Sequence, residues 1–587
     1  MKITRKRQRL LGAVAIAGAA AVMLAACTTS GSTTKPTSKS GGTITIAQVN
    51  EATSFNYNTP QGNLDFNGMI NYMTAPQFFT LDPNFKILPN KDLGTYEKTS
   101  DDPLTVKYTL NKGLKWSDGK PMTADDLVLG WAESSCYYDS ATTDDSGKVT
   151  KGTQYFVTAA GCPFTSELPK VSDDNLSITF SYTKPYVDWN IVNPIAQPAH
   201  VVAKAAGVST EDLTKAFLDT PKGDTANPAP ANDVLKKAAD FVNTGYDATS
   251  LPSNKDLLVS GGPLMVSAWT PKQSMTFVKN PEYKGDHAIK FDKLVVRFIG
   301  DANAQVTALQ NGEVDAIQPQ ADADTVKALK AASGTKLIQG DQVAYDHLDL
   351  NFKSSVFKDP TVRQAFMLTI PRQQIVDSIT KPINPKAVVL DSQIFLPSQP
   401  EYAQAIKQNG SSAYDKVDIA KAKSLLAGKT PTVKILYNTN NPNRVNSFQA
   451  IQASAAKAGF KVTDGGSPDW STLLSGGDYD ASIFGWINPG VGNAALPQLF
   501  QIGNPSNYNN FNNKQASDLA VQSQSTLDAS KLLDIKMQID KLAFQDGYGL
   551  PLFQTPGLFA ADSKVDGVKW FGGQTGIVWN IWDWSKK

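Results

Sequence analysis

The alternation of short strand-like segments with helical segments is the feature that most limits how this chain can fold. Residues 104–110 (LTVKYTL) alternate apolar and polar side chains as a half-buried strand does, and residues 291–300 (FDKLVVRFIG) indicate a second strand. Residues 362–376 instead place apolar side chains at helical spacing until Pro371 interrupts the pattern. Strands that alternate with helical segments in this way predict an α/β fold.

The length and charge of the chain limit its organisation and its partners. About 545 residues follow a polar N-terminal segment, more than one hydrophobic core usually organises, so we expect two or three lobes. The formal charge is +1, and removal of residues 1–26, which hold five cations and no acids, leaves −4. This balance lacks the basic footprint of a nucleic-acid-binding protein.

The first 27 residues predict export. A basic start precedes the uncharged run from Leu10 to Ala26, and the run ends in Leu-Ala-Ala-Cys at Cys27. This ending resembles the bacterial lipobox, in which the cysteine is lipidated and becomes the mature N-terminus. A plain signal peptide with an incidental Cys27 is the alternative. Residues 28–42 are rich in Ser, Thr, Gly, Lys and Pro and suit a flexible tether. We therefore expect a lipid-anchored protein at the outer face of the cell membrane.

Two cysteines remain once Cys27 is assigned to lipid. In an oxidising compartment Cys136 and Cys162 predict a disulfide that closes a loop of about 25 residues, worth roughly 3 kcal/mol in the chain-entropy model. Two free thiols are the alternative. A metal site is a poorer interpretation, because two cysteines without a nearby histidine cannot complete a tetrahedral shell.

The residues that catalysis would need form no recognisable set. The motifs H-E-x-x-H, C-x-x-C and G-x-S-x-G are all missing. Paired aspartates such as Asp125 and Asp126, which follow Thr123, are typical of the first turn of a helix. We therefore expect no enzyme, no metal and no cofactor, with an extracellular hydrolase as an alternative.

Several motifs occur together in a fixed order. They occupy residues 41–58, 110–131, 260–285, 299–317, 350–376, 414–429, 477–486 and 545–555. The second contains KWSDGKPMTADDL, and the fifth contains LNFKSSVFKDPTVRQAF. In this order the motifs resemble those of the solute-binding proteins of ABC importers, specifically solute-binding protein family 5, which serves peptides, nickel and opines.

The resemblance implies a periplasmic-binding-protein-like fold of class II, cluster C. Two α/β lobes then face a ligand cleft, an additional lobe is attached, and the chain crosses between lobes near residues 340 and 550. The expected boundaries are a signal peptide at 1–26, a tether at 27–42, lobe I at 43–60 with 196–339 and 553–587, the additional lobe II at 61–195, and lobe III at 340–552.

The resemblance also indicates which residues line the cleft. Trp470 and Trp486 fall where peptide-binding relatives place tryptophans in the pocket wall, and their large rings contact varied side chains at low entropic cost. Core packing is the alternative for each tryptophan. The candidates from lobe I are Val49, Asn50 and Glu51, and a solvent-facing loop is the alternative for these three. The candidates from the second crossing are Gln554 and Thr555.

One departure from the family pattern bears on the ligand. Peptide-binding relatives carry an aspartate three residues after the second tryptophan, where it pairs with the ligand's α-amino group. Here Pro489 holds that position and Asn488 precedes it. A neutral amide pairs with an ammonium group more weakly than a carboxylate does. Asn488 would suit a peptide bound differently, a blocked peptide or a sugar.

The leading hypothesis is therefore a monomeric receptor that delivers oligopeptides to the permease subunits of an ABC importer. The first alternative is the same role for an oligosaccharide or another polar solute. The second is an envelope sensor that keeps the fold without feeding a permease.

Overall fold

The computed structural model describes residues 41–143, 149–159, 164–226, 231–487, 493, 495–504 and 506–587. The signal peptide, the tether up to residue 40, Cys27, Cys162 and Asn488 lie outside the described residues, so the statements about them stay predictions. In the ranges that the structure describes, no helix is long and apolar enough to cross a lipid bilayer.

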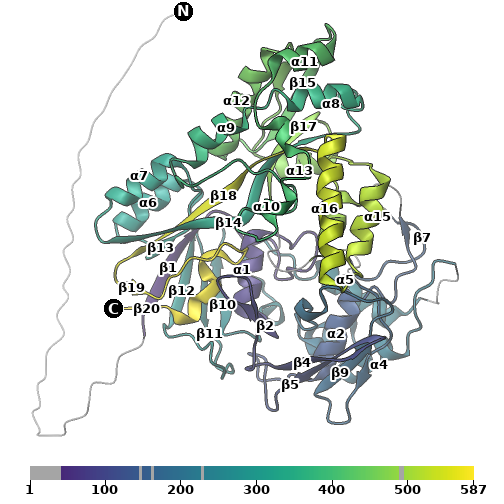
Figure 1. The fold of residues 1–587 in the computed structure, drawn as a ribbon. Helices are drawn as coiled ribbons and strands as arrows, with labels where there is room; N and C mark the ends of the chain where they lie inside the picture. The colour runs from purple at the N-terminus through teal and green to yellow at the C-terminus, as the bar shows by residue number, and fades with distance from the viewer. Residues whose placement is uncertain are drawn as a thin grey trace, which may run out of the picture. The chain divides into compact units, whose positions relative to one another are not determined.

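The largest element is a mixed sheet of ten strands (Figure 1). In spatial order they are β10 (Leu264–Thr270), β11 (Ser274–Lys279), β12 (Lys293–Phe298), β1 (Thr43–Gln48), β13 (Ala316–Ile317), β18 (Gly549–Asp562), β14 (Thr335–Leu350), β17 (Ala481–Ile487), β15 (Thr432–Tyr437) and β16 (Lys461–Asp464). Strand β1 is parallel to β12 and β13, and β15 is parallel to β16 and β17. The remaining pairings are antiparallel.

Two long strands join the halves of this sheet. β14 and β18 pair antiparallel from Thr335 with Asp562 to Asp349 with Gly549. Beyond them, β18 pairs with β13 in one half and β14 pairs with β17 in the other. These strands lie near residues 340 and 550, where the resemblance implies that the chain crosses between lobes.

Helices pack on both halves of the sheet. With the β1 half pack α1 (Asp65–Thr74), α6 (Ala302–Gln310) and α7 (Ala323–Ala331). With the β15 half pack α8 (Pro360–Met367), α9 (Arg372–Ile375), α11 (Ile419–Leu426) and α12 (Pro442–Ala456). The gap between α8 and α9 contains Pro371, which confirms the predicted interruption of this helix. Strands and helices combined in this way confirm the α/β class.

A separate antiparallel sheet carries its own core. Its order is β4 (Gly94–Asp101), β5 (Leu104–Leu110), β9 (Ser177–Ser181) and β8 (Lys170–Val171). The helices that share this core are α2 (Ala124–Ser134), α3 (Ala199–Ala206), α4 (Thr210–Asp219) and α5 (Asp233–Thr244). The Asp126 carboxylate accepts the backbone N–H of Thr123 at 2.9 Å and that of Ala199 at 2.8 Å, so it fixes the start of α2 and of α3 together. Residues 199–244 thus pack with this lobe, although the expected boundary of lobe II is 195.

Four more helices lie near the ends of β14 and β17, around the candidate site. They are α13 (Trp470–Gly476), α14 (Leu496–Phe500), α15 (Lys514–Ser523) and α16 (Ala529–Asp546). Helices α15 and α16 lie side by side (Figure 1). The short elements are α10 (Tyr402–Ala405), β2 (Phe79–Leu81), β3 (Ile87–Pro89), β6 (Thr142–Thr143), β7 (Val149–Lys151), β19 (Val565–Asp566) and β20 (Ser585–Lys586).

Candidate ligand-binding site

Three side chains form a row across the strands that join the two halves of the sheet. Tyr345 of β14 pairs with Trp486 of β17 on one side and with Gln554 of β18 on the other. Paired residues on neighbouring strands project to the same face of a sheet, so the three side chains share one face. Pairing therefore brings together two predicted site residues from distant parts of the chain.

A cavity of about 650 Å³ opens at Tyr345 and Trp486. The loop of residues 393–401, helix α14 with Asn493 and Ala495 just before it, and the first two turns of α16 form its remaining described walls. Apolar side chains such as Phe395 and Leu532 alternate there with a few polar ones. This volume falls in the range of 300–1,000 Å³ that is typical of small-molecule sites, and the mixed lining is typical of them too.

Hydrogen bonds fix Gln393, which begins the loop wall of the cavity. Its backbone carbonyl accepts the Tyr345 hydroxyl at 2.9 Å, and its side-chain amide donates to the Gly549 carbonyl at 3.2 Å. Its backbone N–H donates to the carboxylate of Asp540 in α16 at 2.8 Å. The same carboxylate accepts the Ser392 hydroxyl at 2.8 Å. The loop is therefore tied to β14, β18 and α16 at once.

The contact between this loop and α16 depends on the buried carboxyl group of Asp540. Its side chain has no exposed surface, and burial raises its pKa to about 6. Hydrogen bonds from Asn409, Gln393 and Ser392 act in the opposite direction, because they stabilise the charged form. Asp540 therefore changes protonation in the mildly acidic range while it holds the cavity wall.

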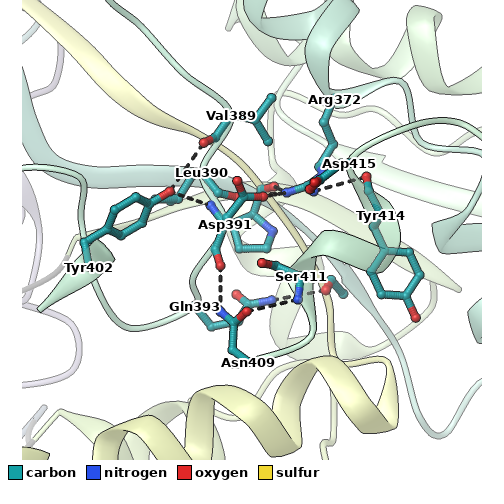
Figure 2. Close-up of polar contacts among 12 residues, drawn as sticks. Arg372, Val389, Leu390, Asp391, Gln393, Tyr402, Asn409, Ser411, Tyr414 and Asp415 are labelled. Carbon is teal, nitrogen blue, oxygen red and sulfur yellow. Dashed lines mark hydrogen bonds and ion pairs between the residues drawn. The ribbon is translucent and has the colours of Figure 1, made fainter. Parts of the chain in front are cut away.

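A buried arginine anchors the strand-like segment just before that wall (Figure 2). The Arg372 guanidinium donates to the Asp391 carboxylate at 2.8 Å, to the Leu390 carbonyl at 3.0 Å and to the Tyr414 carbonyl at 3.1 Å. Tyr402 accepts the backbone N–H of Asp391 through its hydroxyl at 2.9 Å. Burial raises the pKa of Asp391, and the arginine lowers it again in part. This network therefore fixes the position at which the loop of residues 393–401 begins.

The two predicted tryptophans have different surroundings. Both are half-buried and both contact the ring of Phe484, at centroid distances of 6.3 Å for Trp470 and 6.4 Å for Trp486. The Arg444 guanidinium lies 5.2 Å from the Trp470 ring and pairs with Asp346. Only Trp486 of the two contributes to the cavity wall that the structure describes.

The predicted residues of lobe I make contacts within their own neighbourhood. Val49 is 40% exposed. Asn50 donates to the Asp65 carboxylate at 3.0 Å, and Glu51 accepts the backbone N–H of Lys272 at 2.8 Å. Among the described residues that line the 650 Å³ cavity, none comes from residues 49–51.

The two predicted residues of the second crossing also lie outside the cavity lining. The Gln554 amide donates to the Gln342 carbonyl at 2.8 Å. The Thr555 hydroxyl oxygen is buried and has no hydrogen-bond partner among the described residues. It is therefore a polar group that a ligand or a water molecule could still satisfy.

Several cavity residues escaped the sequence prediction. Tyr345, Gln393, Glu401 and Lys536 come from three separate segments, and no local motif marks any of them. For one of these residues, Tyr345, the sequence did give a signal, because the predicted crossing between lobes near residue 340 lies in the strand that contains it. Long-range pairing brings these segments together, and a single sequence does not display it.

A second cavity of about 340 Å³ has an entirely different lining. Trp582, Tyr283 and His287 belong to it, and the Asp92 carboxylate accepts the Tyr283 hydroxyl at 2.9 Å and lies 3.0 Å from the His287 ring nitrogen. These groups satisfy one another. Among the described residues, no group of three or more His, Cys, Asp or Glu side chains could hold a metal ion.

The fold is that of the periplasmic binding proteins. A periplasmic EDTA-binding protein, EppA, superimposes with a TM-score of 0.78 at 23% identity, covering 93% of this chain and 96% of that one. The oligopeptide-binding protein AppA from Bacillus subtilis, solved with a nonapeptide, gives a TM-score of 0.69 at 19% identity, with 93% and 99% covered. These likenesses confirm the predicted fold class.

The sequence comparisons then establish the family. The model of the bacterial extracellular solute-binding proteins, family 5, matches residues 89–508. The oligopeptide-binding protein OppA of Mycobacterium tuberculosis is 23% identical over 551 residues, which cover 90% of this chain and 82% of that protein. The dipeptide-binding protein DppE of Bacillus subtilis is 20% identical over 536 residues, with 89% and 88% covered. This chain belongs to family 5 of the extracellular solute-binding proteins, and it is a solute-binding protein of the ABC-importer type rather than an enzyme.

Proposed function

We propose that this protein is a lipid-anchored receptor that binds oligopeptides outside the cytoplasmic membrane and delivers them to an ABC permease. The observation that carries the proposal is the 650 Å³ cavity at Tyr345 and Trp486, on strands that join the two halves of the sheet. Relatives named for oligopeptide and dipeptide binding support the ligand class. Cys27 is the proposed lipid attachment site, and Cys136 with Cys162 is the proposed disulfide.

The lining of the cavity suits a peptide of variable sequence. Trp486 and Phe395 offer large apolar surfaces, which contact different side chains without a fixed hydrogen-bond pattern. A cleft between hinged lobes excludes water when it closes on its ligand, so polar groups of the wall gain strength in the closed state. The aspartate that pairs with the α-amine in relatives is replaced by Pro489, so the peptide amine needs another partner here.

The experiment compares binding to the two cavities. Calorimetry with a mixed tetrapeptide library and with a neutral oligosaccharide mixture is run on the wild type, on Trp486→Ala and on Trp582→Ala. We expect the peptides to bind, and Trp486→Ala to weaken them by ~1–3 kcal/mol, or about 5- to 150-fold in Kd. Trp582→Ala is the matched control, because it removes the same side chain from the second cavity.

Two outcomes would contradict the proposal. If the oligosaccharides bind and the peptides do not, the receptor serves a different solute. If Trp582→Ala weakens peptide binding while Trp486→Ala leaves it unchanged, the ligand occupies the second cavity.

A further inference from the structure

The pairing of β14 with β18 is interrupted where the two halves of the sheet meet. The register shifts between Asp341 and Tyr345, and residues 342–344 have no paired residue in β18. On one side of this interruption β18 pairs with β13, and on the other side β14 pairs with β17. A few residues that lie between regular segments can absorb the change in φ and ψ of a hinge. Residues 342–344 are therefore the point at which the β1 half and the β15 half can rotate against each other.

The first turn of α12 is fixed to the β15 half. Phe448 and Ile451 of this helix lie in the core of that half. The Arg444 guanidinium donates to the Asp346 carboxylate of β14 at 3.2 and 3.3 Å. Gly485 of β17 leaves room for this ion pair, because a Cβ there would lie 2.8 Å from an atom of each side chain. The first turn of α12 therefore moves together with β14 and β17.

Two asparagines at the start of α12 contact the β1 half. The Asn443 side chain is buried, and its amide donates to the backbone carbonyl of Ala321 at 2.9 Å. Ala321 lies between β13 and α7 and is buried in the core of the β1 half. The amide of Asn441, the N-cap of α12, donates to the side-chain oxygen of Gln320 at 3.3 Å. Both hydrogen bonds therefore connect the two halves at a place away from the strands that join them.

A rotation at residues 342–344 would break these two contacts. In the arrangement of this structure, here called closed, no other hydrogen bond from the described chain reaches the Ala321 carbonyl. Loss of the Asn443 amide would leave that carbonyl buried and unsatisfied in the closed arrangement, whereas water would satisfy it in an open one. The cost of an unsatisfied buried carbonyl corresponds to a change of about 5- to 150-fold in the ratio of closed to open molecules.

We propose that residues 441–444 are a latch that holds the two halves of the sheet in the closed arrangement, with the bond from Asn443 to Ala321 as its main contact. This inference goes beyond the proposed function, because it concerns an equilibrium that exists with or without a ligand. A ligand that binds the closed arrangement better gains from the latch, since less of its binding free energy is then needed to close the protein.

The test measures the distance between the two halves in the full chain without ligand. Nitroxide labels are attached through an unnatural amino acid at two exposed positions, Lys330 of α7 and Lys457 at the end of α12, so the native cysteines are not involved. Double electron–electron resonance then gives the ratio of short to long distances. We expect Asn443→Ala to lower this ratio by about 5-fold or more. Release of a bound tetrapeptide, followed by stopped flow, should become faster in the same variant.

Two further variants separate the latch from damage to the helix. Gln320→Ala removes the second contact from the β1 half, so it should lower the ratio as well, by less than Asn443→Ala because its bond is longer. Asn446→Ala removes the same side chain at an exposed position of α12 and should behave as the wild type. If Asn443→Ala does not fold, Gln320→Ala carries the test.

The outcomes distinguish the latch from the proposed function. If Asn443→Ala and Gln320→Ala both keep the wild-type ratio, the latch is wrong, whether or not peptides bind. If Asn446→Ala lowers the ratio as much as Asn443→Ala does, the contact between the halves is not the cause and the latch is wrong too. If the ratio falls as expected but no peptide library binds the wild type, the latch stands and the proposed function is overturned.

Discussion

Replacement of Asp540 by asparagine tests whether a buried carboxyl group controls the cavity wall. In the native protein burial raises the pKa of Asp540 to about 6, whereas the ordinary value is 3.8. Between these values the native state keeps a proton that the unfolded chain has released. The stabilisation from this group is therefore present at low pH and lost as the pH rises through about 6.

The magnitude follows from the pKa difference. Each pKa unit corresponds to about 1.4 kcal/mol, so the rise from 3.8 to about 6 corresponds to about 3 kcal/mol in total. About 2 kcal/mol of this amount falls between pH 4.5 and pH 7.5, because the carboxyl group of the unfolded chain is already mostly ionised at pH 4.5. Asp540→Asn removes the titration. It also adds a donor–donor contact with Asn409 or Gln393, at a cost of ~1–3 kcal/mol that does not depend on pH.

The assay is urea unfolding of the wild type and Asp540→Asn at both pH values, followed by tryptophan fluorescence. We expect the wild type to lose about 2 kcal/mol relative to the variant as the pH rises from 4.5 to 7.5. Asp534→Asn, an exposed position on the same helix, should follow the wild type. If the wild type and Asp540→Asn respond equally to pH, Asp540 does not carry the raised pKa and the reasoning is refuted.

Three further predictions concern other parts of the chain. Intact-mass analysis of membrane-extracted protein should show Cys27 as a lipidated N-terminus, and Cys27→Ser should lower the membrane-bound fraction; retention of residues 1–26 in the wild type would contradict this. Thiol labelling under denaturing, non-reducing conditions should find Cys136 and Cys162 unreactive, whereas two labelled cysteines would exclude the disulfide. Arg372→Met should lower the free energy of unfolding, measured with urea, by ~3 kcal/mol. This value is the lower end of the range for a broken buried ion pair, because the Asp391 side chain is 23% exposed. An unchanged unfolding midpoint would mean that the network around Arg372 does not hold the loop.

Local chemistry explains which features the sequence could predict. The start of α2 at Thr123 and the interruption at Pro371 depend on neighbouring residues alone, and both were predicted correctly. The row of Tyr345, Trp486 and Gln554 depends on strand register across more than 200 residues. A single sequence does not display that register, so Tyr345 was missed although both of its neighbours were candidates.

The lining of the cavity also depends on contacts between distant segments, which a single sequence does not display. Trp470 and Trp486 were both candidates for the pocket wall, but the Arg444 guanidinium lies beside Trp470, whereas Trp486 reaches the cavity wall. Lys536 lies within an ordinary amphipathic helix, and only the folded chain brings it to the same cavity as Glu401. Residue type alone could not separate these cases, because each depends on which distant segment packs alongside.

A crystal structure of the purified protein with a bound peptide from a tetrapeptide library would show which of the two cavities holds the ligand. We expect peptide density in the 650 Å³ cavity, against Trp486 and Tyr345. Peptide density in the cavity of Trp582 and His287, with the first cavity holding only water, would contradict it.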